Sequence, residues 1–316
     1  MVPGEPGRHR SVLSGQGRAD RPGARLSGSD RQVPRRAAVV GSPVAHSLSP
    51  VLHGAAYAEL GLTSWTYDRV EVPAGGLPGH VRSLGPEWVG LSVTMPGKEE
   101  ALTLATAASP DAVLTGAANT LVRRDGGWYA DNTDVAGLAT AVELELGRTG
   151  AGRVRQALVL GGGATARSAV LALHRLGARE ITLLVRDGVR PGTAAMLDRL
   201  TEAPDAPLVR TRRLAEGIPL DRSTAQVVVS TLPGAASAPV LLPDGEDPAV
   251  VDVTYLPWPS ALARSVAERT GGRVPVVRGT SMLLHQAVHQ VELMTGLGAP
   301  IEAMAAALAG HLEDGR

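Results

Sequence analysis

The stretch Ala157-Leu-Val-Leu160-Gly161-Gly-Gly163-Ala-Thr-Ala166-Arg167 decides the fold. Its four apolar residues predict a buried strand, and the pattern from Ala164 to Leu176 predicts a helix that Gly177 ends. The glycines match G-x-G-x-x-A, in which small residues allow a tight turn and let backbone amides approach a pyrophosphate at a helix N-terminus. We interpret this turn as a dinucleotide-binding loop, with a purely structural glycine turn as the alternative. Its residues are Gly161, Gly162, Gly163, Ala164, Thr165 and Ala166.

Strands and helices alternate after this loop. Apolar runs predict strands at 181–185, 227–230 and 250–253, and helices are expected at 194–200 and 262–269. Strands that alternate with helices form parallel sheets through right-handed crossovers. The second half of the chain is therefore predicted to be a doubly wound parallel sheet.

The segment before the loop predicts a second α/β unit. Strands are expected at 36–41, 65–72 and 88–94, and a strand pair at 118–122 and 128–130 is joined by the turn Arg124-Asp-Gly-Gly127. Ser49 as N-cap before Pro50 predicts a helix over 49–60, and another is expected over 98–108. The chain ends in a helical pattern from 282 to 310, interrupted near 296–300. The fold class is therefore α/β with two domains.

Composition excludes several classes of protein. At 316 residues and 44% hydrophobic content, the chain can bury the cores of two domains. Its formal net charge of zero disfavours a nucleic-acid binder. The absence of cysteine excludes disulfides and thiolate chemistry, and fits a reducing compartment, so we expect a cytoplasmic location. No apolar run reaches the roughly 18 residues of a membrane span.

Residues 1–36 differ from the rest of the chain. They hold eight arginines against Glu5, Asp20 and Asp30, with many Gly, Ser and Pro and no periodic apolar pattern. We predict a disordered basic tail. An upstream start codon chosen in error is an alternative, and a nucleic-acid-binding arm is a less favoured one.

Lys98 is the only lysine in the chain and stands in Ser92-Val-Thr-Met-Pro-Gly-Lys98. A guanidinium stays protonated at any ordinary pH, whereas an ammonium can lose its proton. A lone lysine among arginines is thus a candidate for proton chemistry, unless codon bias alone has left it there.

The end of the second strand after the glycine loop bears on the choice of nucleotide. Arg186 and Arg190 could clamp a 2′-phosphate, which favours NADP. Asp187 could instead accept from a free ribose hydroxyl, which would favour NAD. The usual acidic position is the last residue of the strand, here the apolar Val185. We therefore favour NADP. The alternative for both arginines is a solvated helix entry.

Polar loops in the first half could bind a small substrate. Ser47 and Ser49 place two hydroxyls before a helix, where they could donate to a carboxylate, although capping alone would also explain Ser49. Asn119 and the run Asp131-Asn-Thr-Asp134 add amides and carboxylates in loops, where function tends to concentrate.

Together these motifs resemble the shikimate dehydrogenase family, from about Ala37 to the C-terminal helices. Six pieces occur in the family's order. They are G-S-P-V-A-H-S-L-S-P at 41–50, S-V-T-M-P-G-K-E-E-A at 92–101, G-A-A-N-T-L at 116–121, D-N-T-D at 131–134, G-G-G-A-T-A-R at 161–167 and M-L-L-H-Q-A at 282–287.

The resemblance implies a reaction and a set of site residues. The reaction is the reversible, NADPH-dependent reduction of 3-dehydroshikimate to shikimate, on the way to chorismate and aromatic amino acids. Lys98 and Asp134 resemble the family's catalytic pair, and Gly279 matches a glycine whose backbone lies near the nicotinamide. The residues that match substrate-binding groups are Ser47, Ser49, Thr94, Asn119, Tyr255 and Gln286.

The resemblance also implies a domain division. Residues 37–134 and 280–316 would form the substrate-binding catalytic domain, and residues 135–279 an NADP-binding Rossmann domain. We expect no metal, no nucleic acid, no membrane, and a monomer or homodimer. The alternatives are a quinate or aminoshikimate dehydrogenase using NAD or NADP, another two-domain dehydrogenase, and a non-catalytic nucleotide-sensing relative.

Overall fold

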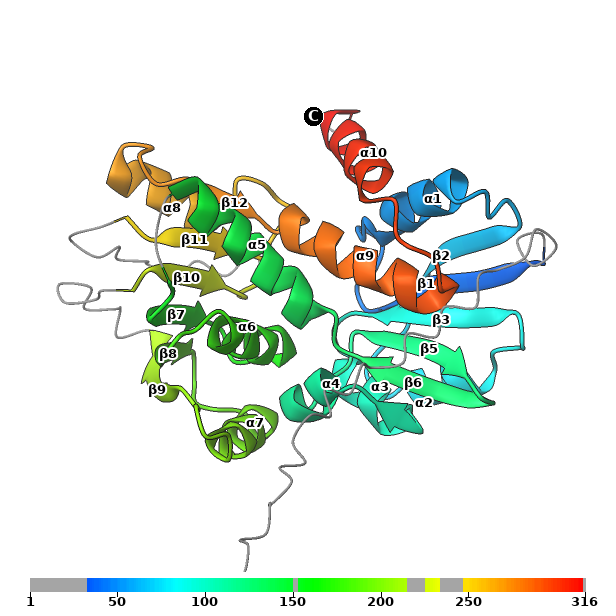
Figure 1. The fold of residues 1–316 in the computed structure, drawn as a ribbon, viewed down its shortest axis with the longest axis horizontal. Coiled ribbons are helices and arrows are strands. Elements are labelled where there is room, and N and C mark those ends of the chain that lie inside the picture. The colour runs from blue at the N-terminus through cyan, green and yellow to red at the C-terminus, as the bar shows by residue number, and fades with distance from the viewer. Residues whose placement is uncertain (1–32, 150–152, 215–224, 234–246, 315–316) are drawn as a thin grey trace, which may run out of the picture.

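The computed structural model describes residues 33–149, 153–214, 225–233 and 247–314. The tail predicted over residues 1–36 lies outside the described residues up to residue 32. Its predicted end is wrong, because Arg35 and Arg36 belong to the strand Arg35–Gly41. Two six-stranded sheets, each with its own helices, make up the described chain (Figure 1). The predicted α/β class is confirmed.

The second sheet in chain order is parallel throughout, with strand order β12-β11-β10-β7-β8-β9. Its strands are β7 Gln156–Leu160, β8 Glu180–Val185, β9 Leu208–Arg213, β10 Val227–Ser230, β11 Ala249–Asp252 and β12 Val276–Arg278. The strand order reverses between the central neighbours β7 and β10. Doubly wound sheets bind ligands at such a point, outside the carboxyl ends of the strands. The loop that begins at Gly161 leaves β7 there.

Helices cover both faces of this sheet, which explains why its central strands are apolar without alternation. Ala157 and Val159 of β7 share one core with α5 (Asp134–Thr149), α6 (Ala164–Arg175) and α7 (Pro191–Thr201). Leu158 and Leu160 share the opposite core with α8 (Ala261–Thr270). Successive side chains of a strand point to opposite faces, so one apolar run supplies both cores.

The first sheet is mixed, with strand order β2-β1-β3-β5-β6-β4. β1 pairs in parallel with β2 and β3, whereas β5 runs antiparallel to β3 and β6. The β5–β6 hairpin turns at Asp125 and Gly126, both at positive φ as a two-residue hairpin requires. The strands are β1 Arg35–Gly41, β2 Trp65–Glu71, β3 Trp88–Val93, β4 Ala107–Ala108, β5 Thr120–Arg124 and β6 Gly127–Asp131. The helices between them are α1 Ser49–Glu59, α2 Leu77–Arg82, α3 Lys98–Leu104 and α4 Pro110–Thr115.

The chain returns from the second sheet to the first at its C-terminal end. α9 (Thr280–Thr295) packs along α5, and α10 (Ile301–Asp314) packs against α1 (Figure 1). Leu52 of α1, Ala287 and Val291 of α9 and Met304 of α10 share one buried cluster. The break predicted near 296–300 is confirmed, because Gly296 caps α9 in the left-handed conformation.

Two local predictions are wrong. The N-cap of α1 is Leu48, not Ser49, and no side chain caps this helix. The helix expected over 98–108 stops at Leu104, because residues 107–108 pair with β6 as the short strand β4. No element was predicted over 134–149, where the structure has α5. Among the described residues, no helix combines the length and apolar character that crossing a membrane needs.

Candidate functional site

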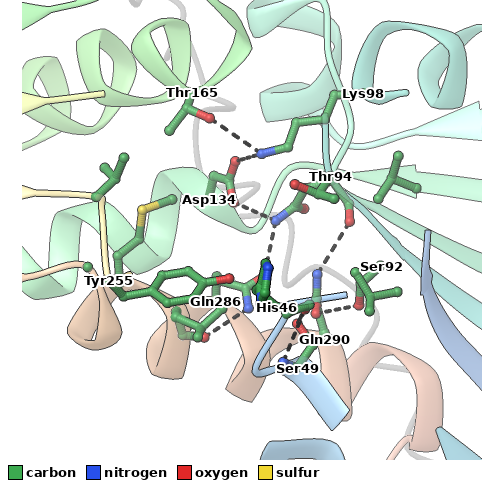
Figure 2. Close-up of a pocket in the computed structure, with 18 of the residues that line it drawn as sticks. His46, Ser49, Ser92, Thr94, Lys98, Asp134, Thr165, Tyr255, Gln286 and Gln290 are labelled. Carbon is green, nitrogen blue, oxygen red and sulfur yellow. Dashed lines mark hydrogen bonds and ion pairs between the residues drawn. The ribbon is translucent and has the colours of Figure 1, made fainter. Parts of the chain in front are cut away.

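A cavity of about 270 Å³ is lined by residues from both units of the fold, and Figure 2 shows the side chains around it. We call it the central pocket. All eight residues predicted to be catalytic or substrate-binding line it, namely Lys98, Asp134, Ser47, Ser49, Thr94, Asn119, Tyr255 and Gln286. Two residues predicted to bind the cofactor, Thr165 and Gly279, line it as well. The predicted site residues therefore come together from segments more than 200 positions apart.

Lys98 and Asp134 form an ion pair at the wall of the pocket. Lys98 is the first residue of α3 and Asp134 the first of α5, so both side chains leave helix N-termini. The Lys98 Nζ lies 2.5 Å from the Asp134 Oδ2, with side-chain exposures of 14% and 5%. The same Nζ lies 3.5 Å from the Thr165 Oγ1 of the glycine loop. The ammonium thus stands where the two units of the fold meet.

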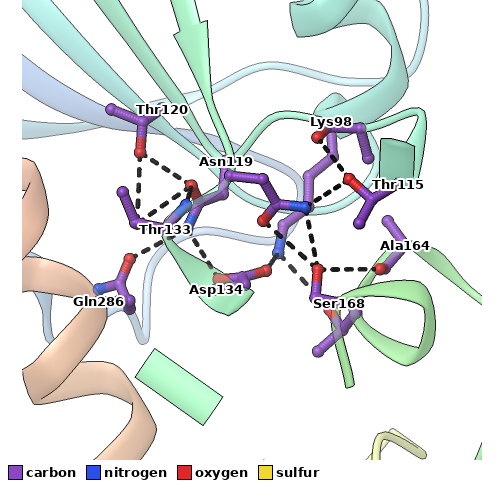
Figure 3. Close-up of polar contacts among 12 residues, drawn as sticks. Lys98, Thr115, Asn119, Thr120, Thr133, Asp134, Ala164, Ser168 and Gln286 are labelled. Atoms are coloured by element: carbon purple, nitrogen blue, oxygen red, sulfur yellow. Dashed lines mark hydrogen bonds and ion pairs between the residues drawn. The ribbon is translucent and has the colours of Figure 1, made fainter. Parts of the chain in front are cut away.

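Asn119 holds this pair in place (Figure 3). Its Nδ2 donates to the Asp134 Oδ1 at 2.7 Å and to the Gln286 Oε1 at 3.2 Å. Its Oδ1 accepts from the Thr133 backbone N–H at 2.9 Å and from the Thr120 Oγ1 at 2.8 Å. These donors leave one amide orientation in which every bond is satisfied. Asp134 is therefore bonded on both oxygens.

Ser47 and Ser49 line the opposite side of the pocket, where α1 begins. The Ser47 Oγ donates to the Ser49 Oγ at 3.2 Å and accepts from the Ser49 backbone N–H at 3.3 Å. Arg69, from β2, donates twice to the Ser47 carbonyl oxygen, at 2.9 and 2.7 Å. This fixes the loop that carries the two hydroxyls.

Tyr255 reaches the pocket from the segment that follows β11. Arg278 donates twice to its carbonyl oxygen, at 3.0 and 2.6 Å. Burial raises the pKa of the Tyr255 phenol, so this group stays protonated and can act as a donor at neutral pH. Its side chain projects toward Gln286 in Figure 2.

The glycine loop has a backbone that fits a bound pyrophosphate. Gly161 has φ +116°, and a Cβ there would lie 2.3 Å from the Thr231 Oγ1 after β10. Gly163 is the N-cap of α6, no side chain caps that helix, and a Cβ there would meet nothing closer than an Arg190 nitrogen at 4.0 Å. The open helix N-terminus thus presents unpaired backbone amides with a cation beside them, which suits a phosphate.

Arg186 and Asp187 lie on the surface outside the central pocket. The Arg186 Nε donates to the Asp187 Oδ2 at 2.8 Å, and the two side chains are 81% and 80% exposed. Arg190 is the N-cap residue of α7 and faces the glycine loop. The Asp187 carboxylate, which could accept a hydrogen bond from a ribose hydroxyl, is therefore already bonded to Arg186.

Gly279 is the N-cap residue of α9, and it approaches the backbone after β11 closely. A Cβ at Gly279 would lie 2.0 Å from the Val253 carbonyl oxygen, so no larger residue fits. Its N–H donates to the Thr254 carbonyl at 3.1 Å. Gly279 therefore lets α9 start at the edge of the pocket.

Sequence reasoning missed several polar residues of the site. Ser92, His46 and Gln290 also line the central pocket, and Thr133 bonds Asn119 behind it. Gln290 stands four residues after Gln286 on α9, a spacing that puts both on one helix face. The spacing of Gln286 and Gln290 in the sequence could therefore have indicated that Gln290 belongs to the site. Among the described residues, no three His, Asp or Glu side chains gather as metal ligands would.

Parts of the chain match the models of one protein family. Residues 39–121 match the family model for the shikimate dehydrogenase substrate binding domain, and residues 279–309 match that for the shikimate 5′-dehydrogenase C-terminal domain. The chain is 37% identical over 269 residues to the shikimate dehydrogenase (NADP(+)) of Methylobacterium radiotolerans, covering 83% of this chain and 91% of that one. The chain belongs to the shikimate dehydrogenase family.

Solved structures of the family share the fold. The shikimate dehydrogenase of Mycobacterium tuberculosis is 42% identical and superposes with a TM-score of 0.72, covering 88% of this chain and 100% of that one. The Thermus thermophilus enzyme in complex with NADP(H) and shikimate is 29% identical, with a TM-score of 0.70, 87% of this chain covered and 99% of that one.

Proposed function

We propose that this protein is an NADP-dependent shikimate dehydrogenase that reversibly reduces 3-dehydroshikimate to shikimate. The observation that carries the proposal is the Lys98–Asp134 pair, at 2.5 Å, in a pocket that also holds Thr165 of the glycine loop. Membership of the family and the NADP(+)-dependent relatives support it.

Lys98, Asp134 and Asn119 have different proposed roles in the reaction. Reduction of a ketone puts negative charge on its oxygen, and the Lys98 ammonium can stabilise this charge and donate a proton from Nζ. Asp134 holds the ammonium through Oδ2, while Asn119 holds Asp134 through Oδ1. General acid catalysis of this kind is worth roughly 10²- to 10⁴-fold.

The remaining polar side chains would orient the substrate. Ser47 and Ser49 are proposed to donate to its carboxylate, across the pocket from Lys98. Thr94 and Gln286 are proposed to bond the ring hydroxyls, and Tyr255 to lie at the edge of the substrate. Asn119 is proposed to order the Lys98–Asp134 pair. Because these groups come from both units, a bound substrate would be fixed between them and water excluded from the reacting oxygen.

The glycine loop is the proposed binding site of the cofactor. Residues 161–166 would hold the pyrophosphate on backbone amides, Arg186 and Arg190 a 2′-phosphate, and Gly279 would lie near the nicotinamide. When bound, NADPH supplies the hydride to the substrate carbon. We also propose the domain division of 37–134 with 280–316 and 135–279. The cytoplasmic location and the monomeric or homodimeric state stay predictions.

The test is a spectrophotometric assay of cofactor reduction by the purified full-length protein. Shikimate, quinate and an aminated shikimate analogue are each offered with NADP and with NAD. We expect the highest kcat/KM with shikimate and NADP. Faster turnover of quinate or the aminated analogue would reassign the substrate, and no reduction with any pair would leave a nucleotide-binding, non-catalytic protein.

A further inference from the structure

Gln290 lies in a buried polar chain behind the central pocket (Figure 2). Gln290 is only 1% exposed, although it is among the residues that line the cavity. The Oε1 accepts from the Ser92 Oγ at 2.6 Å and faces the His53 Nε2 at 3.3 Å. The Nε2 donates to the Thr120 Oγ1 at 3.0 Å and to the Asn119 carbonyl oxygen at 3.3 Å. Both ends of the amide are therefore engaged.

The donors around Gln290 admit one orientation of its amide. The Tyr67 hydroxyl donates to the Ser92 Oγ at 2.6 Å, so the single proton of Ser92 is left to point at the Gln290 Oε1. A reversed amide would put Oε1 against the Asn119 carbonyl oxygen, acceptor against acceptor. Gln290 is thus fixed as an acceptor toward Ser92 and a donor toward Asn119 and Thr120.

His53 adds a second constraint on the same oxygen. It is fully buried, stacked on Tyr67 at 3.9 Å between ring centres, with Tyr57 edge-on at 6.0 Å. Burial lowers the pKa of His53 to about 3, so the ring is neutral at physiological pH. Its Nδ1 has no partner among the described residues, and a lone pair is cheaper to leave unpaired there than an N–H. The Nε2–H tautomer therefore faces Gln290.

From Gln290 the chain continues to the ion pair. Thr120 accepts from Gln290 and uses its own proton on the Asn119 Oδ1 at 2.8 Å. That bond turns the Asn119 Nδ2 toward the Asp134 Oδ1, and the Asp134 Oδ2 holds the Lys98 Nζ. Gln290 also bonds the backbone oxygen of Asn119 directly. The side chain and the backbone of Asn119 thus both depend on Gln290.

We propose that Gln290 is a positioning residue, which through Thr120 and Asn119 sets the geometry of the Asp134–Lys98 pair. The inference rests on the proposed function for its kinetic readout. It differs from that function because Gln290 does not bond Asp134 or Lys98 itself, and acts only through the intervening side chains.

The test compares two substitutions of similar volume. Gln290→Met removes donor and acceptor, while Gln290→Glu keeps an acceptor for Ser92 but removes the donor to Thr120. We expect both to lower kcat roughly 10-fold or more and to move the pH profile of kcat, with the affinity for NADP unchanged. His289→Gln, at the preceding and half-exposed position of α9, is the matched control and should match wild type.

A double-mutant cycle separates positioning from packing. In an Asn119→Ala background, Gln290→Met should have less than about a twofold further effect on kcat, since the path runs through Asn119. Independent multiplication of the two losses would overturn the proposal, as would a Gln290→Met enzyme with wild-type kcat and pH profile.

One readout does not depend on turnover. The side-chain amide signals of Asn119, followed by NMR in isotope-labelled full-length protein, should shift and broaden in Gln290→Met and stay unchanged in His289→Gln. If wild type proves inactive with shikimate, the proposed function fails, but this measurement still decides the positioning role. Unchanged Asn119 signals in Gln290→Met would contradict it.

Discussion

Lys98 is held in place at two points, its backbone carbonyl oxygen and its side-chain Nζ. Its carbonyl oxygen accepts from the Ala118 N–H at 2.8 Å, which ties the start of α3 to the segment that carries Asn119. Its Nζ is bonded to Asp134 and lies within 3.5 Å of Thr165. Lys98 is therefore fixed both at its backbone and at its Nζ, between the segment that carries Asn119 and the glycine loop.

Lys98→Arg should lower kcat by roughly 10²- to 10⁴-fold while leaving the affinity for NADP within about twofold. A guanidinium keeps the positive charge but is a poor proton donor, and its plane does not fit the space of a compact ammonium. Steady-state kinetics with shikimate and calorimetric titration of NADP check the two parts. Near-wild-type turnover would remove Lys98 from proton transfer.

His53 is a buried neutral base whose stability effect depends on pH. Because its folded pKa lies below the unfolded value of about 6.5, the unfolded chain takes up a proton that the folded chain does not. Its contribution is fully present above about pH 6.5 and is lost as the pH falls toward about 3. The facing tyrosines, Tyr57 and Tyr67, have raised pKa values and do not titrate in this window.

His53→Phe should therefore reduce the sensitivity of the fold to acid. Phenylalanine keeps the stack on Tyr67 and has no titrating group. Between about pH 7.5 and about pH 5, wild type should lose about 2 kcal/mol more unfolding free energy than the variant. Urea unfolding at both pH values measures the difference. The exposed His311→Phe serves as control. Equal acid sensitivity of His53→Phe and wild type would show that folding does not lower the pKa of His53.

At the scale of elements, α9 carries Gln286 and Gln290 on one face and delivers both to the pocket. It reaches that position because α5 offers Gly137 at the crossing. A Cβ on Gly137 would lie 2.9 Å from the Gln286 Cβ, from the Gln286 backbone nitrogen and from the Met282 carbonyl oxygen. A glycine in a helix interior is otherwise unfavourable, so close packing explains its presence.

Gly137→Ala should push α9 away from α5 and displace Gln286. We expect a loss of about 1 to 3 kcal/mol in stability from overpacking, together with a raised KM for shikimate. Gly147→Ala is the matched control on the same helix, since a Cβ there meets nothing within 4 Å. That substitution should stabilise by up to about 1 kcal/mol through helix propensity. Chemical unfolding of the two variants should give stability changes of opposite sign, and steady-state kinetics should show a raised KM only for Gly137→Ala. Stability changes of the same sign would argue against tight packing at Gly137.

At the scale of the whole molecule, polar contacts join the two units beside the pocket. The Arg167 guanidinium of α6 is 1% exposed and donates to the Glu99 Oε1 at 2.7 Å, while the Asn132 Nδ2 donates to the Ser168 Oγ at 3.0 Å. Glu99 is the neighbour of Lys98, and Arg167 follows the glycine loop directly. The Glu99–Arg167 contact therefore joins the segment that carries Lys98 to the glycine loop.

Glu99→Gln should destabilise the protein by about 1 to 2 kcal/mol and weaken the binding of shikimate more than that of NADP. The cost is below the roughly 3 to 5 kcal/mol of a fully buried pair because the Glu99 side chain is 63% exposed. Thermal unfolding and titration of each ligand measure these effects. Glu143→Gln, exposed on α5, is the control. Equal behaviour of the two variants would mean that the Arg167 contact does not couple the units.

The sequence by itself predicted the fold class of the two halves of the chain and ten of the residues that line the central pocket. Apolar runs followed by glycines predict strands that end in tight turns, and motifs such as Ser92–Lys98 are local, so both are visible without coordinates. The prediction of a helix over 98–108 failed because strand pairing in the folded protein overrides the local helical pattern. Residues 107–108 leave the helical pattern because β6 offers them a partner.

Only the tertiary structure decided how the site works. The orientation of Asn119, the role of Gln290 and the fit of Gly137 depend on contacts between residues up to 237 positions apart. Hydrogen-bond direction and close packing are properties of atoms in space, and no local pattern encodes them. The sequence therefore supplied the lysine and its acidic partner, while the fold fixed their 2.5 Å contact and the chain of donors that maintains it.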